Sequence, residues 1–289
     1  MKEVVILSGK GGTGKTSLVG SFAALARSAV LADCDVDAAD LHLLLNPSVK
    51  ETLDFWSGQV AVIDNEKCNH CELCQEVCRF DAIHDFRVDS VSCEGCGFCY
   101  QVCPAEAISI RECLSGRWFV SDTKYGSLVH ARLGVAQENS GKLVALVRQK
   151  ARQIAEKQGL DYIISDGPPG IGCPVISSLT NANLALLVTE PTLSGMHDLD
   201  RVLGVCRHFG VPAAVCINKF DLNDDNTRQI ESYCLEQGVA VVSRIPFDNI
   251  FTEALAHEQP VVEYAQSEIT STIRSLWQYI THALEEERR

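Results

Sequence analysis

The chain has 289 residues, a hydrophobic content of 46% and a formal net charge of -13 at pH 7. This length and hydrophobicity suffice for one large domain and a smaller one, while the acidic balance argues against nucleic-acid binding through clustered Lys and Arg. No apolar stretch approaches the ~18 residues that span a bilayer, so no membrane insertion is expected. Without a secretory signal, fourteen cysteines predict a cytoplasmic protein whose reduced thiols can bind metal.

Short β-branched stretches alternate with amphipathic stretches along most of the chain, which predicts an α/β fold with a parallel sheet covered by helices. The expected strands are residues 4–8, 30–33, 162–166, 184–189, 213–218 and 239–245. The expected helices are residues 15–26, 142–158, 195–208 and 227–237.

A phosphate-binding motif follows the first expected strand directly. Its pattern is G-x-x-x-x-G-K-[ST], and a helix is expected to begin at Lys15. In such a loop, backbone N–H groups and the helix N-terminus bind phosphate oxygens, Lys15 reaches the β and γ phosphates, and Thr16 binds Mg²⁺. The predicted nucleotide-binding residues of the loop are Gly9, Lys10, Gly11, Gly12, Thr13, Gly14, Lys15, Thr16 and Ser17.

Residues 64–112 interrupt this rhythm with two copies of a 25-residue unit, each carrying C-x-x-C-x-x-C-x-x-x-C. This segment is expected to be an inserted domain, between a first part of the surrounding domain at 1–63 and a second part at 113–289. Closely spaced thiolates suit iron-sulfur clusters, whereas zinc sites favour two C-x-x-C pairs separated by a spacer.

The two copies resemble the bacterial two-cluster ferredoxin, in which the fourth cysteine of each copy binds the other cluster. The resemblance implies two [4Fe-4S] clusters in a small α+β domain. One cluster would use Cys68, Cys71, Cys74 and Cys103, and the other Cys93, Cys96, Cys99 and Cys78. Cys103 precedes Pro104 as in the ferredoxins, but Cys78 precedes Arg79. Residues 64–112 include ten acidic and four basic residues. This acidic surface would complement a basic redox partner, but it fits a surface that contacts only solvent equally well.

Two features are expected nearer the C-terminus. Segments 118–122 and 127–132 flank Tyr125-Gly126 and predict a hairpin. A helical stripe of apolar residues predicts a helix packed on the core rather than on a membrane surface, because its polar face carries Glu instead of Lys and Arg. The stripe consists of Ile269, Ile273, Leu276, Trp277, Ile280 and Leu284.

The loop has a second lysine, Lys10, at its start, and therefore resembles the deviant phosphate loop of the MinD, ParA, Mrp and nitrogenase iron-protein ATPases. The resemblance implies that Lys10 reaches the partner's nucleotide in a face-to-face dimer. It also implies that Asp35 lies in switch I near Mg²⁺ and the attacking water, and that Asp166 is the Walker B aspartate that begins switch II. Weaker matches assign adenine contacts to Asn218, Pro246 and Asp248.

The remaining cysteines are expected to differ in role. Cys206, Cys216 and Cys234 fall in predicted helices or strands and are expected to be small buried hydrophobic residues. Cys173 follows Asp166 by seven residues. The nitrogenase iron protein has a cysteine at a similar spacing that helps to hold a cluster bridging two subunits. Ordinary packing and a metal or redox role both stay open for Cys173.

Together these features resemble the MinD-superfamily ATPases with an inserted ferredoxin domain. The resemblance implies a doubly wound, mostly parallel P-loop NTPase fold, Mg-ATP binding, and pairing as a homodimer or with a homologous ATPase. Two classes of function stay open. In one, ATP hydrolysis, with Lys10, Lys15 and Asp35 as catalytic residues, gates electron transfer to a redox acceptor protein. In the other, the chain is an iron-sulfur assembly or carrier factor, or a positioning ATPase that senses redox state.

Overall fold

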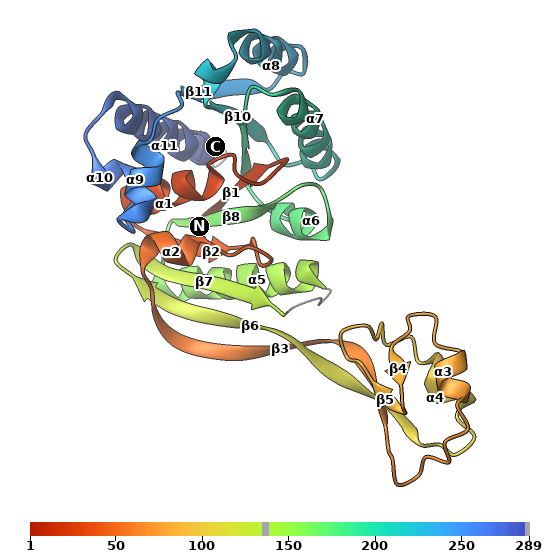
Figure 1. Cartoon of the computed structure of the whole chain (residues 1–289). Helices are drawn as coiled ribbons and strands as arrows, with labels where there is room; N and C mark the ends of the chain where they lie inside the picture. Colours follow the sequence, from red (N-terminus) through yellow and green to blue (C-terminus); the bar gives the residue numbers. More distant parts are fainter. Residues whose placement is uncertain (135–138, 287–289) are drawn as a thin grey trace. The chain divides into compact units, whose positions relative to one another are not determined.

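The computed structural model describes residues 1–134 and 139–286, and its chain divides into two compact units (Figure 1). Unit 1 comprises Met1–Thr52, Trp118–Arg132 and Ser140–Arg289. Unit 2 comprises Leu53–Arg117 and Leu133–Asn139. Unit 2 therefore contains the expected insert at 64–112 and is longer than it on both sides.

A nine-stranded sheet in the order β11-β10-β9-β1-β8-β2-β7-β6-β3 forms the centre of unit 1, and β3 and β6 continue into unit 2. All pairings of β1, β2 and β10 with their neighbours are parallel, which confirms the mostly parallel sheet. The strands are β1 (Lys2–Ser8), β2 (Ala29–Asp33), β3 (Ser48–Ile63), β6 (Ile108–Thr123), β7 (Gly126–Leu133), β8 (Tyr162–Pro169), β9 (Leu184–Thr189), β10 (Ala213–Asn218) and β11 (Ala240–Ile245).

Helices cover both faces of this sheet (Figure 1). Alternate side chains of β1 point to opposite faces: Val4 and Ile6 pack in one core, whereas Val5 and Leu7 pack in the other. The sheet is therefore doubly wound. The first core contains residues of α1 (Lys15–Leu25), α2 (Leu41–Leu45), α9 (Ile250–Ala256), α10 (Val261–Tyr264) and α11 (Glu268–Glu286). The second face is covered by α5 (Ser140–Gln158), α6 (Cys173–Leu179), α7 (Leu193–His208) and α8 (Asp224–Glu236).

The predicted hairpin and the predicted C-terminal helix are both confirmed. Strands β6 and β7 are joined by Lys124 and Tyr125, and the whole apolar stripe of α11 is buried. Trp277 stacks on Phe22 of α1 with ring centroids 5.4 Å apart, so the helix is docked on the core. Within residues 1–134 and 139–286, no helix is long and apolar enough to cross a membrane.

Strand β3 was not predicted, and β6 is longer than the expected segment 118–122. Both strands have 16 residues. Most side chains of β3 are exposed or only partly buried, so the strand lacks the apolar alternation from which a half-buried strand is recognised. Helix α6 was missed as well, since its seven residues give slightly less than two turns of periodicity.

Unit 2 repeats its backbone conformation along with its sequence. Its elements are two short helices, α3 (Leu73–Glu76) and α4 (Phe98–Val102), and an antiparallel pair, β4 (Ile83–His84) and β5 (Arg87–Val88). Three pairs of residues 25 positions apart share the left-handed conformation. They are His70 (φ 57°) and Gly95 (61°), Glu72 (65°) and Gly97 (75°), and Asp81 (51°) and Glu106 (47°).

Candidate functional site

The loop between β1 and α1 is held by polar contacts at both ends. Asn218, the last residue of β10, donates from Nδ2 to the carbonyl oxygen of Thr13 over 2.8 Å, and Ser8 Oγ donates to the carbonyl oxygen of Lys10 over 2.8 Å. Gly14 has φ 87°, and a Cβ there would lie 2.5 Å from Asn218 Nδ2. The loop therefore requires glycine at this position, and Asn218 contacts its backbone.

Lys15 and both predicted switch aspartates meet at one point. Lys15 is only 6% exposed; its Nζ lies 2.7 Å from Asp166 Oδ1 and 3.7 Å from Asp35 Oδ2. Burial acts to lower the pKa of Lys15, but the charges of Asp166 and Asp35 outweigh it and hold this pKa above its ordinary value. The first turn of α1, which also carries Thr16 and Ser17, thus lies beside the segment that follows β2 and beside Asp166 within β8.

A third carboxylate, Asp33, lies at the same site. It belongs to the segment Asp33-Cys34-Asp35 that resembles switch I, although the sequence suggested a specific role only for Asp35. Asp33 is fully buried and accepts hydrogen bonds from the backbone N–H groups of Asp35 and Leu41, each over 3.2 Å. Burial raises the pKa of Asp33 well above its usual range, and the nearby Asp166 raises it further. Burial also raises the pKa of Asp35, to about 6, against the opposing charge of Lys15. Mg²⁺ in nucleotide sites is usually bound by one or two carboxylates together with substrate phosphates and waters, so these carboxylates fit such an ion when a nucleotide is bound.

Lys10 does not join this group and pairs with Glu190, a residue that the sequence analysis missed. Lys10 Nζ lies 3.1 Å from Glu190 Oε2, and Lys219 Nζ lies 2.5 Å from Glu190 Oε1. Lys219 also donates to the carbonyl oxygen of Gly12 over 3.2 Å. Glu190 follows β9 directly. Asp166 likewise ends its expected strand and Asp35 lies just after its own, and this shared position was the signal that could have found Glu190.

The other predicted residues lie around the loop or after β11. Gly9 packs against α7 so closely that a Cβ would lie 2.1 Å from Asp198 Cβ, whereas Gly11 and Gly12 are exposed. Pro246 follows β11. Asp248 Oδ1 accepts a hydrogen bond from the backbone N–H of Ile250 over 2.8 Å, at the start of α9. The Asp248 side chain thus contacts the backbone two residues further along the chain.

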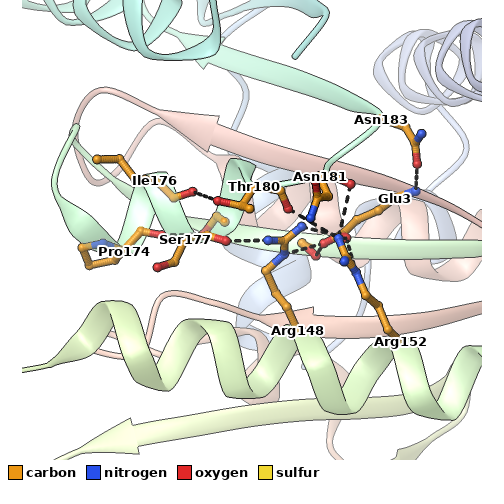
Figure 2. Close-up of polar contacts among 11 residues, drawn as sticks. Glu3, Arg148, Arg152, Pro174, Ile176, Ser177, Thr180, Asn181 and Asn183 are labelled. Carbon is orange, nitrogen blue, oxygen red and sulfur yellow. Dashed lines mark hydrogen bonds and ion pairs between the residues drawn. The ribbon is translucent and has the colours of Figure 1, made fainter. Parts of the chain in front are cut away.

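A largely buried ionic network is centred on Glu3 (Figure 2). Glu3 of β1 accepts hydrogen bonds from Arg148 Nε and Nη2 over 2.7 and 2.8 Å, from Arg152 Nη2 over 2.8 Å and from Ser165 Oγ over 3.0 Å. Arg148 Nη1 also donates to the carbonyl oxygen of Ser177 over 2.5 Å. The network therefore ties β1 and β8 to α5 and α6, the elements on either side of residues 166–170.

The eight cysteines of unit 2 line two separate cavities. One is lined by Cys68, Cys71, Cys74 and Cys103, and the other by Cys78, Cys93, Cys96 and Cys99. Each cavity thus receives three cysteines from one copy and the fourth from the other copy. The fourth cysteines also match in their contacts, since Ala82 N–H donates to Cys78 Sγ and Ala107 N–H to Cys103 Sγ, each over 3.4 Å.

No single-ion site accompanies these cavities. In residues 1–134 and 139–286, no three His, Cys, Asp or Glu side chains converge closely enough to hold one metal ion.

The remaining cysteines divide into buried and exposed thiols. Cys206, Cys216 and Cys234 are at most 1% exposed, which confirms them as core residues. Burial raises the pKa of Cys206 and of Cys216 to about 12 and that of Cys234 to about 11. Cys173, by contrast, is exposed at the start of α6.

Comparison with known proteins gives matches over most of the chain. Residues 4–261 match the CobQ/CobB/MinD/ParA nucleotide binding domain. An uncharacterized protein of Methanocaldococcus jannaschii is 32% identical over 279 residues, 96% of this chain and 95% of that protein. The septum site-determining protein MinD of Bacillus subtilis is 22% identical over 273 residues, covering 90% of this chain and 81% of that protein. The solved structure of MinD from Pyrococcus horikoshii, complexed with Mg-ADP, has a similar fold, with a TM-score of 0.57 at 17% identity and coverage of 96% and 95% of the two chains.

Proposed function

Since the chain belongs to the CobQ/CobB/MinD/ParA nucleotide-binding family, we propose that it binds and hydrolyses Mg-ATP and pairs through its nucleotide sites. The observation that carries this proposal is the meeting of Lys15 with Asp166 at 2.7 Å and with Asp35 at 3.7 Å. At the end of the glycine-rich loop, the buried ammonium group can bind the phosphates of a nucleoside triphosphate, and the two carboxylates can bind its magnesium ion.

The proposal gives each residue of the site a role. Lys15 binds the β and γ phosphates, while Thr16, Asp35 and Asp166 hold Mg²⁺, which neutralises charge on the transferred phosphoryl group. Asp35 orients the attacking water. Lys10 acts on the nucleotide of the partner, either a second copy of this chain or a homologous ATPase.

For unit 2 we propose an inserted domain at 64–112 with two [4Fe-4S] clusters. The pattern of three cysteines from one copy and one from the other supports this proposal, because it is the ligand arrangement of two-cluster ferredoxins. Such clusters supply one-electron chemistry. The chain's own contribution is to hold the thiolates and to donate backbone N–H groups to Cys78 and Cys103, and hydrogen bonds to ligand sulfurs are a means of tuning cluster potentials.

We propose that nucleotide-driven changes at the site gate electron transfer from unit 2 to an acceptor protein. The second candidate, a carrier of iron-sulfur centres, draws on one observation: Cys173 is exposed and follows residues 166–170. An exposed thiol there could hold a cluster that is passed on.

One experiment separates the two candidates. Cluster potentials and cluster retention are measured anaerobically with and without Mg-ATP, in the presence of an apo acceptor. Gating predicts retained clusters whose potential or transfer rate changes by an amount matching ~1 to 3 kcal/mol of allosteric coupling, which is roughly 40 to 130 mV for one electron. Transfer of iron and sulfide to the acceptor, with a potential independent of nucleotide, would favour the carrier.

A further inference from the structure

Glu190 is shared between two lysines that come from different parts of the nucleotide site. Its side chain is largely buried, with 11% exposure, and one carboxylate oxygen faces Lys10 at 3.1 Å while the other faces Lys219 at 2.5 Å. These two ammonium groups lower the pKa of Glu190 against the opposing effect of burial. Glu190 is therefore ionised at neutral pH and attracts both lysines.

Close packing fixes the position of Glu190. A Cβ on Gly195 would lie 2.4 Å from the Glu190 carbonyl oxygen, so the first turn of α7 lies directly against this residue. Thr189 Oγ1 donates to the carbonyl oxygen of Gly195 over 3.1 Å, and Gly195 N–H donates to Thr192 Oγ1 over 2.9 Å. The Glu190 carboxylate thus projects from a rigid junction between β9 and α7.

Lys10 is the less constrained of the two lysines. Its side chain is 34% exposed, and its ammonium group has Glu190 as its ion-pair partner. Lys219 is anchored twice, by Glu190 and by the carbonyl oxygen of Gly12. If Lys10 leaves, Glu190 keeps Lys219 as a counter-charge, which avoids the large cost of a buried carboxylate without any partner.

We propose that Glu190 is a positioning residue that holds Lys10 within its own chain and thereby weakens nucleotide-dependent pairing. This inference rests on the proposed action of Lys10 on the partner's nucleotide. On pairing, Lys10 exchanges the carboxylate of Glu190 for the partner's phosphates, while Lys219 remains with Glu190. The affinity of the pair then depends on the strength of the Lys10–Glu190 contact as well as on the new contacts.

The test compares the full chain with its Glu190→Gln variant, both saturated with Mg²⁺ and a non-hydrolysable ATP analogue. Analytical ultracentrifugation gives the protein concentration at which half of the chains are paired. We expect Glu190→Gln to pair at about threefold to tenfold lower concentration. In the wild type each of the two chains must break its partly exposed Lys10–Glu190 ion pair before pairing, whereas the variant lacks this ion pair. The difference should shrink at high salt, which screens such pairs.

Two controls make the result specific. Glu263→Gln removes the same charge from another ion pair, with Lys124 at 2.7 Å, and should pair like the wild type. In a Lys10→Ala background, Glu190→Gln should no longer strengthen pairing, since the contact it removes is already gone.

Each other result counts against the inference in its own way. Unchanged or weaker pairing of Glu190→Gln, or an equal gain with and without Lys10, would overturn the role of Glu190 while leaving the proposed ATPase intact. A wild-type chain that binds no Mg-nucleotide, or that binds it and never pairs, would overturn the proposed function together with this inference.

Discussion

Lys15 is the central residue of the proposed nucleotide site, because its ammonium group lies among the buried carboxylates. We expect Lys15→Ala to weaken Mg-ATP binding about 100-fold, since hydrogen bonds between charged groups contribute about 1.5–3 kcal/mol each. Isothermal titration calorimetry measures the loss. Asp35→Ala serves as a comparison and should keep binding while slowing hydrolysis. A Lys15→Ala variant with wild-type affinity would show that the loop does not bind the phosphates.

The free thiols outside unit 2 should differ sharply in reactivity. Burial raises the pKa of Cys216 and of Cys234 far above 8, so at pH 8 almost none of either thiol is the reactive thiolate. Cys173 is exposed. Brief alkylation of the folded protein followed by peptide mass spectrometry should therefore modify Cys173 and spare the two buried cysteines. Labelling of all three at equal rates in folded protein would contradict the packing of β10 and α8.

Single residues also show what the sequence could and could not predict at the site. Lys15, Asp35 and Asp166, which the structure brings together, were predicted because each occupies a recognisable place in a motif or near the end of an apolar strand. Glu190 also follows an apolar strand, but neither its pairing with Lys10 and Lys219 nor that of Glu3 with Arg148 could be predicted, since these partners lie more than 25 positions away in the chain. Pairing of this kind depends on the folded arrangement of β1, β9 and α5, for which no local pattern exists.

The network around Glu3 ties helices α5 and α6 to the sheet, in addition to their apolar packing (Figure 2). We expect Arg148→Ala to lower the free energy of unfolding by about 3–5 kcal/mol, because removing one partner of a buried ion pair leaves the other charge uncompensated. Urea denaturation of the full chain, monitored by circular dichroism, measures this change in the free energy of unfolding.

Arg152 provides the matched control for that variant. It contacts the same carboxylate, but its side chain is 31% exposed against 6% for Arg148. Arg152→Ala should therefore cost clearly less than Arg148→Ala. Equal losses in the two variants would mean that the two contacts contribute alike and that burial of Arg148 is not decisive.

Among the strands, those with buried side chains could be predicted from the sequence, whereas the largely exposed β3 could not. Strands β9 and β10 were predicted with their observed bounds, since buried strands of a parallel sheet read as continuous apolar runs. Strand β3 gives no such run because its outer residues are largely exposed. Strand β3 joins the sheet through backbone hydrogen bonds with β6. Such bonds do not require a pattern of hydrophobic side chains, so the sequence does not reveal them.

For the whole molecule, the proposed clusters give the most direct test. Anaerobically purified protein should contain about eight iron atoms per chain, as expected for two four-iron clusters. Cys96→Ser should lower this content by about half, because Cys96 lines one of the two cysteine cavities and not the other. Iron and acid-labile sulfide analysis provides the measurement, and Cys206→Ser, which alters a buried cysteine outside both cavities, is the control. Stoichiometric zinc without iron would contradict the proposal.

The pairing of β3 with β6 has a consequence for how such a chain could arise. The chain leaves the sheet along β3 and returns along its hydrogen-bonded neighbour β6, so unit 2 is attached through two adjacent strands at one end of the strand order. A segment bounded in this way can be gained or lost in evolution without changing the order of the other seven strands. An ancestor in which a short turn joined β3 directly to β6 would already have possessed the complete phosphate loop and both switch aspartates.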